Sequence, residues 1–277
     1  MNLLFPLHPY IAIFLYLCIF ALGLAVGSFI NVVSRRLLRG EAITGRSHCE
    51  SCGKELAWFD LVPLLSFFLL RSRCRYCRAK LSWQYPLIEL VTGVLFVSLF
   101  LKQLAISNQQ LTSQLFLPFC CLLSAASCLV IIFVTDFLER RVFDVVVWVG
   151  IASAFFYRVL FLSAGHSLPA ILSDLLLAAA VFLFFWSLRL VTRGRGMGEG
   201  DPLLGFLVTL LVGFPLGLAV LFLAFVVGAV VGLGLILFGK KKFGEQIPLG
   251  PFLALGALVV LFWGDALWAW YLSFLGL

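Results

Sequence analysis

Acidic side chains next to long apolar segments are the residues of this sequence best suited to chemistry. The 277 residues include only 13 Asp and Glu. Asp136 ends one apolar segment, whereas Asp144 and Asp201 each begin another. An ionisable group near the interior of a membrane costs free energy, and such groups usually mark functional sites. We therefore take these three aspartates as candidate functional residues.

A pair of aspartates can hydrolyse a peptide bond without a metal ion or a serine nucleophile. Two carboxyl groups that lie close together in a low dielectric share one proton. One carboxylate then activates water while its protonated partner polarises the scissile carbonyl, as in aspartic proteases. The only histidines are His8, His48 and His166, and we find no Ser–His catalytic pair among them. The acids therefore predict a protease of the aspartic type.

Alternating glycines precede the third aspartate, in the run from Gly196 through Gly198 and Gly200 to Asp201. Because Pro202 follows, Asp201 can also be read as a helix N-cap, but that reading does not explain the glycines. A dinucleotide-binding fingerprint is excluded, since Asp replaces its third glycine and no strand precedes the run. Glycines leave the backbone bare, so that another chain can approach closely. We expect Gly198 and Gly200 to support a site that grips an extended peptide.

Four cysteines form two C-x-x-C pairs in the only long hydrophilic segment: Cys49, Cys52, Cys74 and Cys77. This spacing is typical of a zinc ribbon in which four thiolates hold one metal ion. Four protein ligands leave no open position for a catalytic water, so we expect a structural zinc that helps the segment to fold. Reduced thiols without a metal and a rubredoxin-like iron site remain alternatives.

The composition places these residues in a membrane protein. Hydrophobic residues make up 63% of the chain and charged residues 12%, against roughly 45–50% and 25% in soluble domains. This excludes collagen-like, disordered and nucleic-acid-binding chains. We predict an all-α polytopic membrane protein with about eight transmembrane helices, one of them short, and a zinc-ribbon-like cytoplasmic loop. The apolar runs lie near residues 10–33, 86–106, 115–135, 143–163, 170–188, 203–214, 217–238 and 251–275.

The positions of the basic residues predict how the chain is oriented. If residues 34–85 lie inside and the helices alternate, 18 of the 20 Lys and Arg are cytoplasmic, as the positive-inside rule requires. Lys102 and Arg158 then lie toward the outer face, where their side chains can snorkel to the lipid headgroups. The candidate aspartates converge at the inner face, whereas Asp174 and Asp265 lie in the outer half. The net charge of +7 is thus expected to face membrane lipids rather than a nucleic acid.

Three segments follow from this map, and no internal repeat is apparent. Residues 10–33 form the first transmembrane helix, residues 34–85 the cytoplasmic cysteine loop, and residues 86–277 a membrane core that carries the aspartates.

The motifs together resemble the type IV prepilin peptidases, also called type IV leader peptidases, which are membrane aspartyl proteases of the GxGD type. The resemblance covers nearly the whole chain and rests on several segments in the family's order. These are Gly27–Val33, the four cysteines, Tyr85–Leu90, the acids Asp136 and Asp144, Gly196–Asp201 and Ile247–Phe252.

The resemblance implies that Asp136 and Asp201 are the catalytic pair and that Asp144 supports them. It implies cleavage of the short basic leader of type IV pilins or type II secretion pseudopilins at the cytoplasmic face of the bacterial inner membrane. It also implies that the new N-terminus is methylated with S-adenosylmethionine, although no binding pocket for this donor is apparent in the sequence.

Two other classes of function fit parts of the pattern. A proton-coupled transporter would use acids distributed through the bilayer, linking the inner group to Asp174 or Asp265. A scaffold for secretion or pilus assembly would use the cysteine loop as a docking module, and its aspartates would be dispensable.

Overall fold

The computed structural model describes residues 9–106, 113–162, 168–194, 197–240, 242 and 248–274, and within them the regular structure is helical. Two isolated β-bridges accompany the helices. The elements are α1 (Pro9–Arg39), η1 (Trp58–Leu61), α2 (Leu65–Leu69), α3 (Gln84–Ile106), α4 (Ser113–Glu139), α5 (Asp144–Leu162), α6 (Leu168–Val191), α7 (Asp201–Val212), α8 (Leu216–Leu237) and α9 (Gly250–Phe274).

The eight expected apolar segments correspond to the eight longer helices, so the prediction of an all-α membrane protein is confirmed. Six of these helices, α1, α3, α4, α6, α8 and α9, contain spans long and apolar enough to cross a membrane. The short segment expected at 203–214 is α7, a helix of 12 residues. Its rise of about 18 Å is less than the hydrocarbon thickness of about 30 Å.

The chain packs as two units, residues 1–112 and 113–277. The division expected from the sequence, into 10–33, 34–85 and 86–277, concerns functional segments and stays a prediction.

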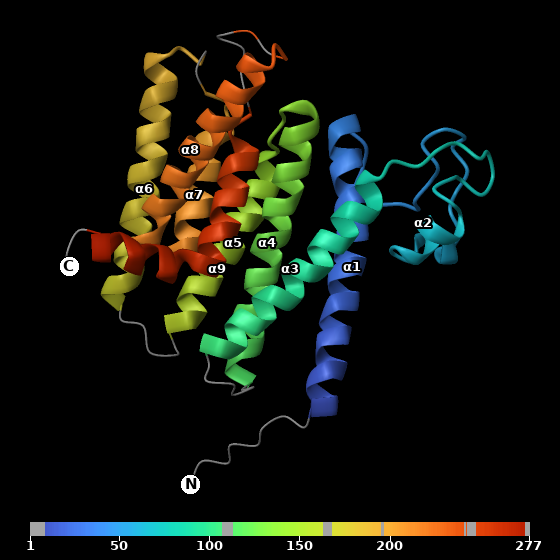
Figure 1. The fold of residues 1–277 in the computed structure, drawn as a ribbon, viewed down its shortest axis with the longest axis horizontal. Helices are drawn as coiled ribbons and strands as arrows, with labels where there is room; N and C mark the ends of the chain where they lie inside the picture. Colours follow the sequence, from blue (N-terminus) through green and yellow to red (C-terminus); the bar gives the residue numbers. More distant parts are fainter. Residues whose placement is uncertain are drawn as a thin grey trace. The chain divides into compact units, whose positions relative to one another are not determined.

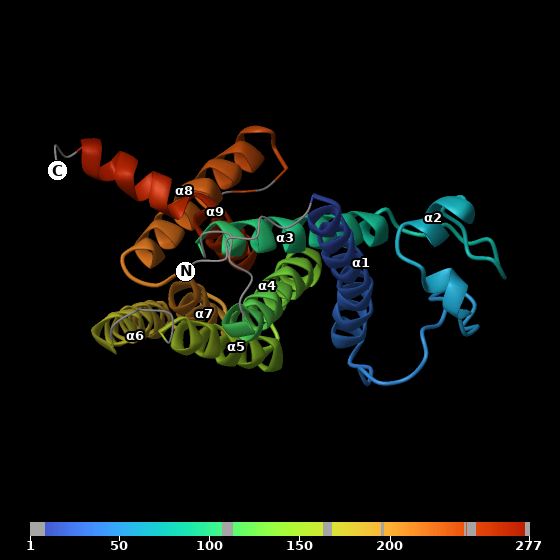
Figure 2. The same cartoon turned by 90° about the horizontal axis from the view of Figure 1, so that it is seen from below.

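In the first unit, α3 crosses α1 closely (Figures 1 and 2). Residues 40–83, the part of the predicted cysteine loop that lies outside these two helices, connect them. Glycines permit the close crossing: a Cβ on Gly23 would lie 2.7 Å from Cα of Gly93, and one on Gly27 would lie 2.7 Å from Cα of Glu89. Small residues at a crossing let the backbones of membrane helices approach each other. Four positions on, Asn31 donates a hydrogen bond to the carbonyl oxygen of Tyr85 at 3.1 Å.

In the second unit, α7 is the central helix and packs against α5, α6, α8 and α9. Ten of its twelve residues are buried, as expected for a helix that is apolar on every side. Helix α4 packs against α5 and α9, so the end of α4 and the start of α7 belong to one packed body.

An ion pair between Arg158 and Asp174 lies next to the C-terminal end of α7, the end farthest from Asp201. Arg158 of α5 donates to Oδ2 of Asp174 through both Nε, at 2.9 Å, and Nη2. Asp174 also accepts a hydrogen bond from the backbone N–H of Phe214 at 2.7 Å. A side chain on Gly213, where φ is +83°, would overlap the guanidinium group. The expectation that Arg158 snorkels to headgroups is therefore wrong, because a buried carboxylate satisfies it instead.

Candidate active site and metal centre

The two aspartates ranked first from the sequence are both buried in the second unit. Asp136 lies in the last turn of α4 and is 5% exposed, and Asp201 is the first residue of α7 and is 8% exposed. The carboxyl groups are near enough to interact electrostatically. The structure thus brings together the pair on which the predicted chemistry depends.

Asp201 is held by backbone groups. The N–H of Gly198 donates a hydrogen bond to Oδ2 of Asp201 at 2.8 Å, and the carboxylate lies at the positive end of the α7 dipole. Pro202 follows at the start of the helix, where a missing N–H costs nothing. Both interactions stabilise the ionised form of Asp201.

Asp136 has different surroundings. Its Oδ2 is buried and forms no hydrogen bond of good geometry, but the backbone N–H of Gly250 interacts with the carboxyl group. The backbone of Gly250, the first residue of α9, lies directly against this carboxyl group, since a Cβ on Gly250 would overlap Oδ2 and lie 3.1 Å from Cγ. Arg140, just after α4, acts on Asp136 electrostatically. An unpaired buried oxygen is available to a substrate or to water.

The three supporting residues predicted from the sequence, Asp144, Gly198 and Gly200, differ in their contacts with the aspartate pair. Asp144 is exposed at the start of α5, and no interaction of it with the buried pair is recorded in the described residues. Gly198 supplies the hydrogen bond to Asp201 described above. A Cβ on Gly200 would lie 2.8 Å from Cβ of Val142 in the turn between α4 and α5. The close approach at Gly200 is therefore made by the chain's own turn, and a grip on an extended peptide stays a prediction. Gly196 lies outside the described residues.

Sequence reasoning missed Gly250 and Val142 as parts of this site. Gly250 lies in the segment Ile247–Phe252, which belongs to the family resemblance but was given no role or neighbour there. Both contacts join segments far apart in the sequence, so spacing alone gave no signal for them.

The four cysteines of the loop converge in the first unit as predicted. Their sulfur atoms all lie within 4.8 Å of one another, and Sγ of Cys49 lies 3.8 Å from Sγ of Cys77. Four sulfurs at about 2.3 Å from a tetrahedral zinc ion would be separated by about 3.8 Å. None of the four forms a disulfide. The donor set and its spacing thus fit a metal ion.

The pKa of the Cys77 thiol shows how the four neighbouring sulfur atoms affect one another. A backbone hydrogen bond from Ala79 lowers its pKa, but desolvation and hydrogen bonds with Cys74, Cys52 and Cys49 outweigh this effect and raise the pKa to about 11. A metal ion would supply the positive charge that four thiolates require.

The two halves of the metal site form an internal repeat that the sequence reading missed. The pattern S-x-C-x-x-C-x-x-x-L-x-W begins at Ser47 and again at Ser72. In each copy, the N–H of the residue after the second cysteine donates to the carbonyl oxygen of the first, at 2.9 and 3.0 Å. That residue, Gly53 or Arg78, has φ of +70° or +58°. Each copy adds one β-bridge, so the two turns present their thiols in the same way.

The fold and the site define an all-α polytopic membrane protein that carries a buried pair of aspartates and a four-cysteine metal-binding loop. Comparisons with known proteins place it in one family. The bacterial peptidase A24 N-terminal domain matches residues 21–103, and the type IV leader peptidase family matches residues 123–233. The chain belongs to the type IV leader peptidase family.

Relatives named "Prepilin leader peptidase/N-methyltransferase" match most of the chain. The protein of Aeromonas salmonicida (strain A449) is 30% identical over 286 residues, covering 92% of this chain and 93% of the relative. That of Burkholderia pseudomallei (strain K96243) is 31% identical over 273 residues, covering 88% and 84%. That of Bacillus subtilis (strain 168) is 29% identical over 259 residues, covering 92% and 97%. No solved structure matches the chain significantly.

Proposed function

We propose that this protein is a bifunctional prepilin leader peptidase and N-methyltransferase of the bacterial inner membrane. Its substrates are type IV pilins or type II secretion pseudopilins, whose basic leader it removes at the cytoplasmic face. The observation that carries the peptidase activity is the burial of Asp136 and Asp201 as an interacting pair. The names of the relatives support both activities.

The surroundings of the two carboxyl groups support different roles in hydrolysis. Asp201 carries the negative charge, because the N–H of Gly198 and the α7 dipole stabilise it. Asp136 carries the proton, because its carboxyl group is buried and faces the negative charge of Asp201.

The proposed reaction then proceeds in two steps. Asp201 takes a proton from water as the water oxygen bonds to the scissile carbonyl carbon, while Asp136 gives its proton to the carbonyl oxygen. Asp201 next gives its proton to the departing nitrogen, the C–N bond breaks, and Asp136 recovers the proton from the hydroxyl group.

We assign zinc to Cys49, Cys52, Cys74 and Cys77 as a structural ion, since four thiolates fill its coordination sphere. S-adenosylmethionine, when bound, supplies the methyl group for the new N-terminal amine. Basic side chains next to the helix ends favour a cytoplasmic cysteine loop in contact with anionic lipid headgroups, and no nucleic-acid partner is proposed.

Purified Asp136→Asn and Asp201→Asn proteins test the peptidase. Incubation with a prepilin followed by mass spectrometry of the products should show cleavage at least about a hundredfold slower than wild type. The matched control is Asp265→Asn, an exposed acid of α9, which should cleave at the wild-type rate. Substantial cleavage by either variant of the buried pair would remove the basis of the proposal.

The ion pair at the far end of α7 argues against the transporter alternative. A proton path through the bilayer would need Asp174 to exchange protons, but Asp174 is committed to Arg158 and to the backbone of Phe214. Aspartate-dependent ion flux in proteoliposomes without proteolysis would reverse this conclusion. The scaffold alternative predicts that the aspartate variants behave as wild type in the cleavage assay.

A further inference from the structure

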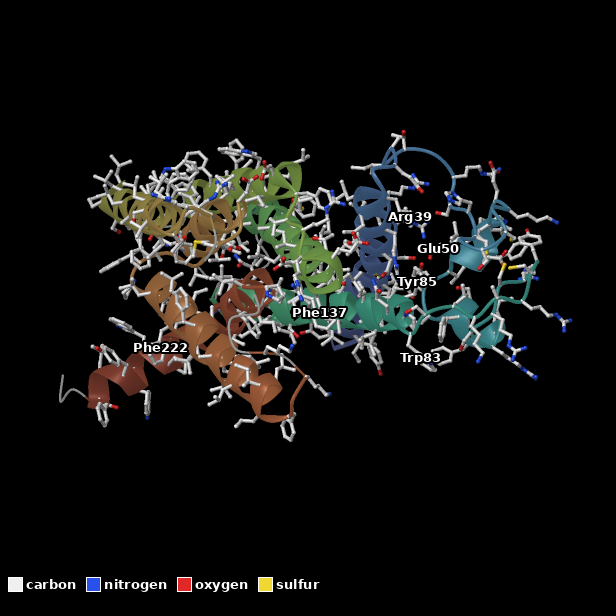
Figure 3. The ribbon with its side chains drawn as sticks, turned by 90° about the horizontal axis from the view of Figure 1, so that it is seen from above. Arg39, Glu50, Trp83, Tyr85, Phe137 and Phe222 are labelled. Atoms are coloured by element: carbon white, nitrogen blue, oxygen red, sulfur yellow. The ribbon has the colours of Figure 1, made fainter. Side chains whose placement is uncertain are left out.

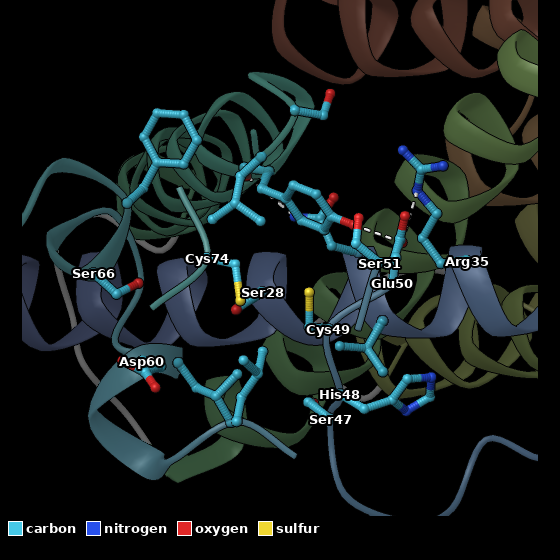
Figure 4. A pocket seen from close by; sticks show the side chains of 18 of the residues that line it. Ser28, Arg35, Ser47, His48, Cys49, Glu50, Ser51, Asp60, Ser66 and Cys74 are labelled. Atoms are coloured by element: carbon cyan, nitrogen blue, oxygen red, sulfur yellow. Dashed lines mark hydrogen bonds and ion pairs between the residues drawn. The ribbon is translucent and has the colours of Figure 1, made fainter. Parts of the chain in front are cut away.

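A partly open cavity of about 280 Å³ lies within the first unit, lined by the end of α1, the cysteine loop and the start of α3 (Figure 4). Its volume is close to the lower end of the range for small-molecule sites, about 300–1,000 Å³. Two of the metal-binding cysteines, Cys49 and Cys74, form part of its wall. The cavity contains none of the residues assigned to peptide hydrolysis.

Polar atoms without a hydrogen-bond partner line this cavity. They are Oδ1 of Asn31, Nε of Arg35 and Oδ2 of Asp60. Asn31 is 1% exposed, and the side chain of Asp60 is 2% exposed. In the view of Figure 4, Arg35 and Asp60 lie on opposite sides of the pocket, with Ser28 and Cys74 between them. Buried polar atoms normally have partners, so these three require a ligand or ordered water.

Several charged groups of the cavity contact other protein groups. Arg35 donates through Nη2 to Gln84 at 3.0 Å, and its Nε lies 3.9 Å from the Glu50 carboxylate without forming a hydrogen bond. Arg36 donates to four backbone carbonyl oxygens of the loop, those of Ala42, Ile43, Gly45 and Arg46. Glu50 accepts a hydrogen bond from the Tyr85 hydroxyl at 2.7 Å and pairs with Arg39 at 3.0 Å, and Figure 3 shows these three residues together. Glu89 accepts the N–H of Leu64 at 2.8 Å. The atoms that still lack a hydrogen-bond partner are thus one cationic donor, which also faces the Glu50 carboxylate, and two acceptors, of which one is anionic.

A donor on Arg35 together with acceptors on Asn31 and Asp60 favours a ligand that carries both a negative and a positive group. A phosphate or an anionic lipid headgroup would satisfy Arg35 but would leave the acceptors of Asn31 and Asp60 unpaired or facing a like charge. An amino acid carries a carboxylate for Arg35 and an ammonium group for the acceptors, and a ribose adds hydroxyl donors. S-adenosylmethionine contains both parts.

We propose that this cavity binds S-adenosylmethionine, with Arg35, Asn31 and Asp60 as its recognition residues. The inference rests on the proposed methyltransferase activity and locates its donor. In the transfer, the amine nitrogen of the substrate forms a C–N bond to the methyl carbon, the C–S bond breaks with its electron pair staying on sulfur, and one amine proton passes to solvent.

Asp60→Asn is the sharpest test variant. The Asp60 carboxylate pairs with Nε of Arg75 through Oδ1 at 2.8 Å, and the carbonyl oxygen of an asparagine can keep that contact. The substitution then replaces an acceptor with a donor at the atom that faces the cavity, and it also removes the negative charge that pairs with Arg75. Equilibrium dialysis of the full-length protein with radiolabelled S-adenosylmethionine, without prepilin, should show a dissociation constant raised about tenfold or more. Asn31→Leu should have the same effect.

Glu55→Gln is the matched control, because Glu55 is also a loop acid paired with an arginine, Arg46, but the pair is exposed and does not line the cavity. It should bind the donor as wild type does. Metal content and melting temperature, measured for each variant, separate lost recognition from lost folding. Ultraviolet crosslinking of the labelled donor to wild-type protein, followed by peptide mapping, should modify residues within 28–89.

Wild-type affinity in both cavity variants, or crosslinks confined to the second unit, would overturn the proposal. In that case methylated product made by the wild-type protein would still uphold the proposed function. A wild-type protein that cleaves prepilin but neither binds the donor nor methylates would refute both the cavity assignment and the methyltransferase, while leaving the peptidase intact.

Discussion

The backbone of Gly250 lies directly against the carboxyl group of Asp136, with no room for a side chain between them. This contact joins the start of α9 to the end of α4 at the buried aspartate pair. A Gly250→Ala substitution should displace Asp136 from its position. Because a displacement of about 1 Å in a catalytic group can cost about a hundredfold in rate, prepilin cleavage should fall by tens to about a hundredfold.

Gly234→Ala provides the control for that substitution. Gly234 lies in α8, and a Cβ there meets nothing within 4 Å. This variant should cleave normally and have a free energy of unfolding higher by about 0.4–1 kcal/mol, because alanine restricts the unfolded chain. Equal cleavage by the two variants would contradict the role assigned to Gly250.

Two explanations for the glycine at position 200 can be separated by a double substitution. If Gly200 is required only because Val142 packs on it, Gly200→Ala should impair cleavage and Val142→Ala should restore much of it in the double variant. If substrate must approach the bare backbone, the double variant should stay inactive. The cleavage rates of the wild type, the two single variants and the double variant together form a double-mutant cycle that measures this coupling.

The Arg158–Asp174 pair should contribute to stability rather than to catalysis. Replacing Asp174 with Asn leaves a largely buried guanidinium group without its counter-charge, which should cost about 3 kcal/mol or more. Thermal unfolding in detergent should show a clear fall in melting temperature. Arg46→Ala breaks an exposed ion pair and should change the free energy of unfolding by at most about 1 kcal/mol. If the two variants lost similar amounts of stability, burial would not explain the contribution of the Arg158–Asp174 pair.

The cysteine loop should hold one metal ion per chain. Elemental analysis of protein purified under reducing conditions should find stoichiometric zinc, and Cys49→Ser should lower both the metal content and the melting temperature. Cys18→Ser, a change at an exposed cysteine of α1 outside the cluster, should leave both unchanged. Absence of a stoichiometric metal from the wild-type protein would reject the assignment.

Hydropathy and spacing predicted much of the architecture. Each apolar run became a helix, because a buried backbone in lipid must satisfy its hydrogen bonds within the segment. The two C-x-x-C pairs identified the metal ligands, since a fixed short gap presents both thiols to one ion. The aspartates emerged because acids beside apolar segments are costly.

What the sequence did not predict depends on packing between distant segments. The contact of Gly250 with Asp136 and that of Gly200 with Val142 are set by how helices cross, for which linear spacing carries no information. The pairing of Arg158 with Asp174 was missed for the same reason, although their opposite charges near two helix ends were a usable signal. The repeat in the cysteine loop is present in the sequence itself, but its two copies differ at every position between the fixed residues, so that only the cysteine spacing stands out.

The length of α7 bears on where proteolysis takes place. Twelve residues reach across little more than half of a hydrocarbon layer, and Asp201 stands at one end while the closed turn at Gly213 stands at the other. With a helix this short, the bilayer must be thinner around it or one end must be submerged. On the function proposed for Asp201, a leader bond is then cut beneath the headgroup plane, and the hydrophobic stem of a pilin is processed while it remains anchored in the lipid.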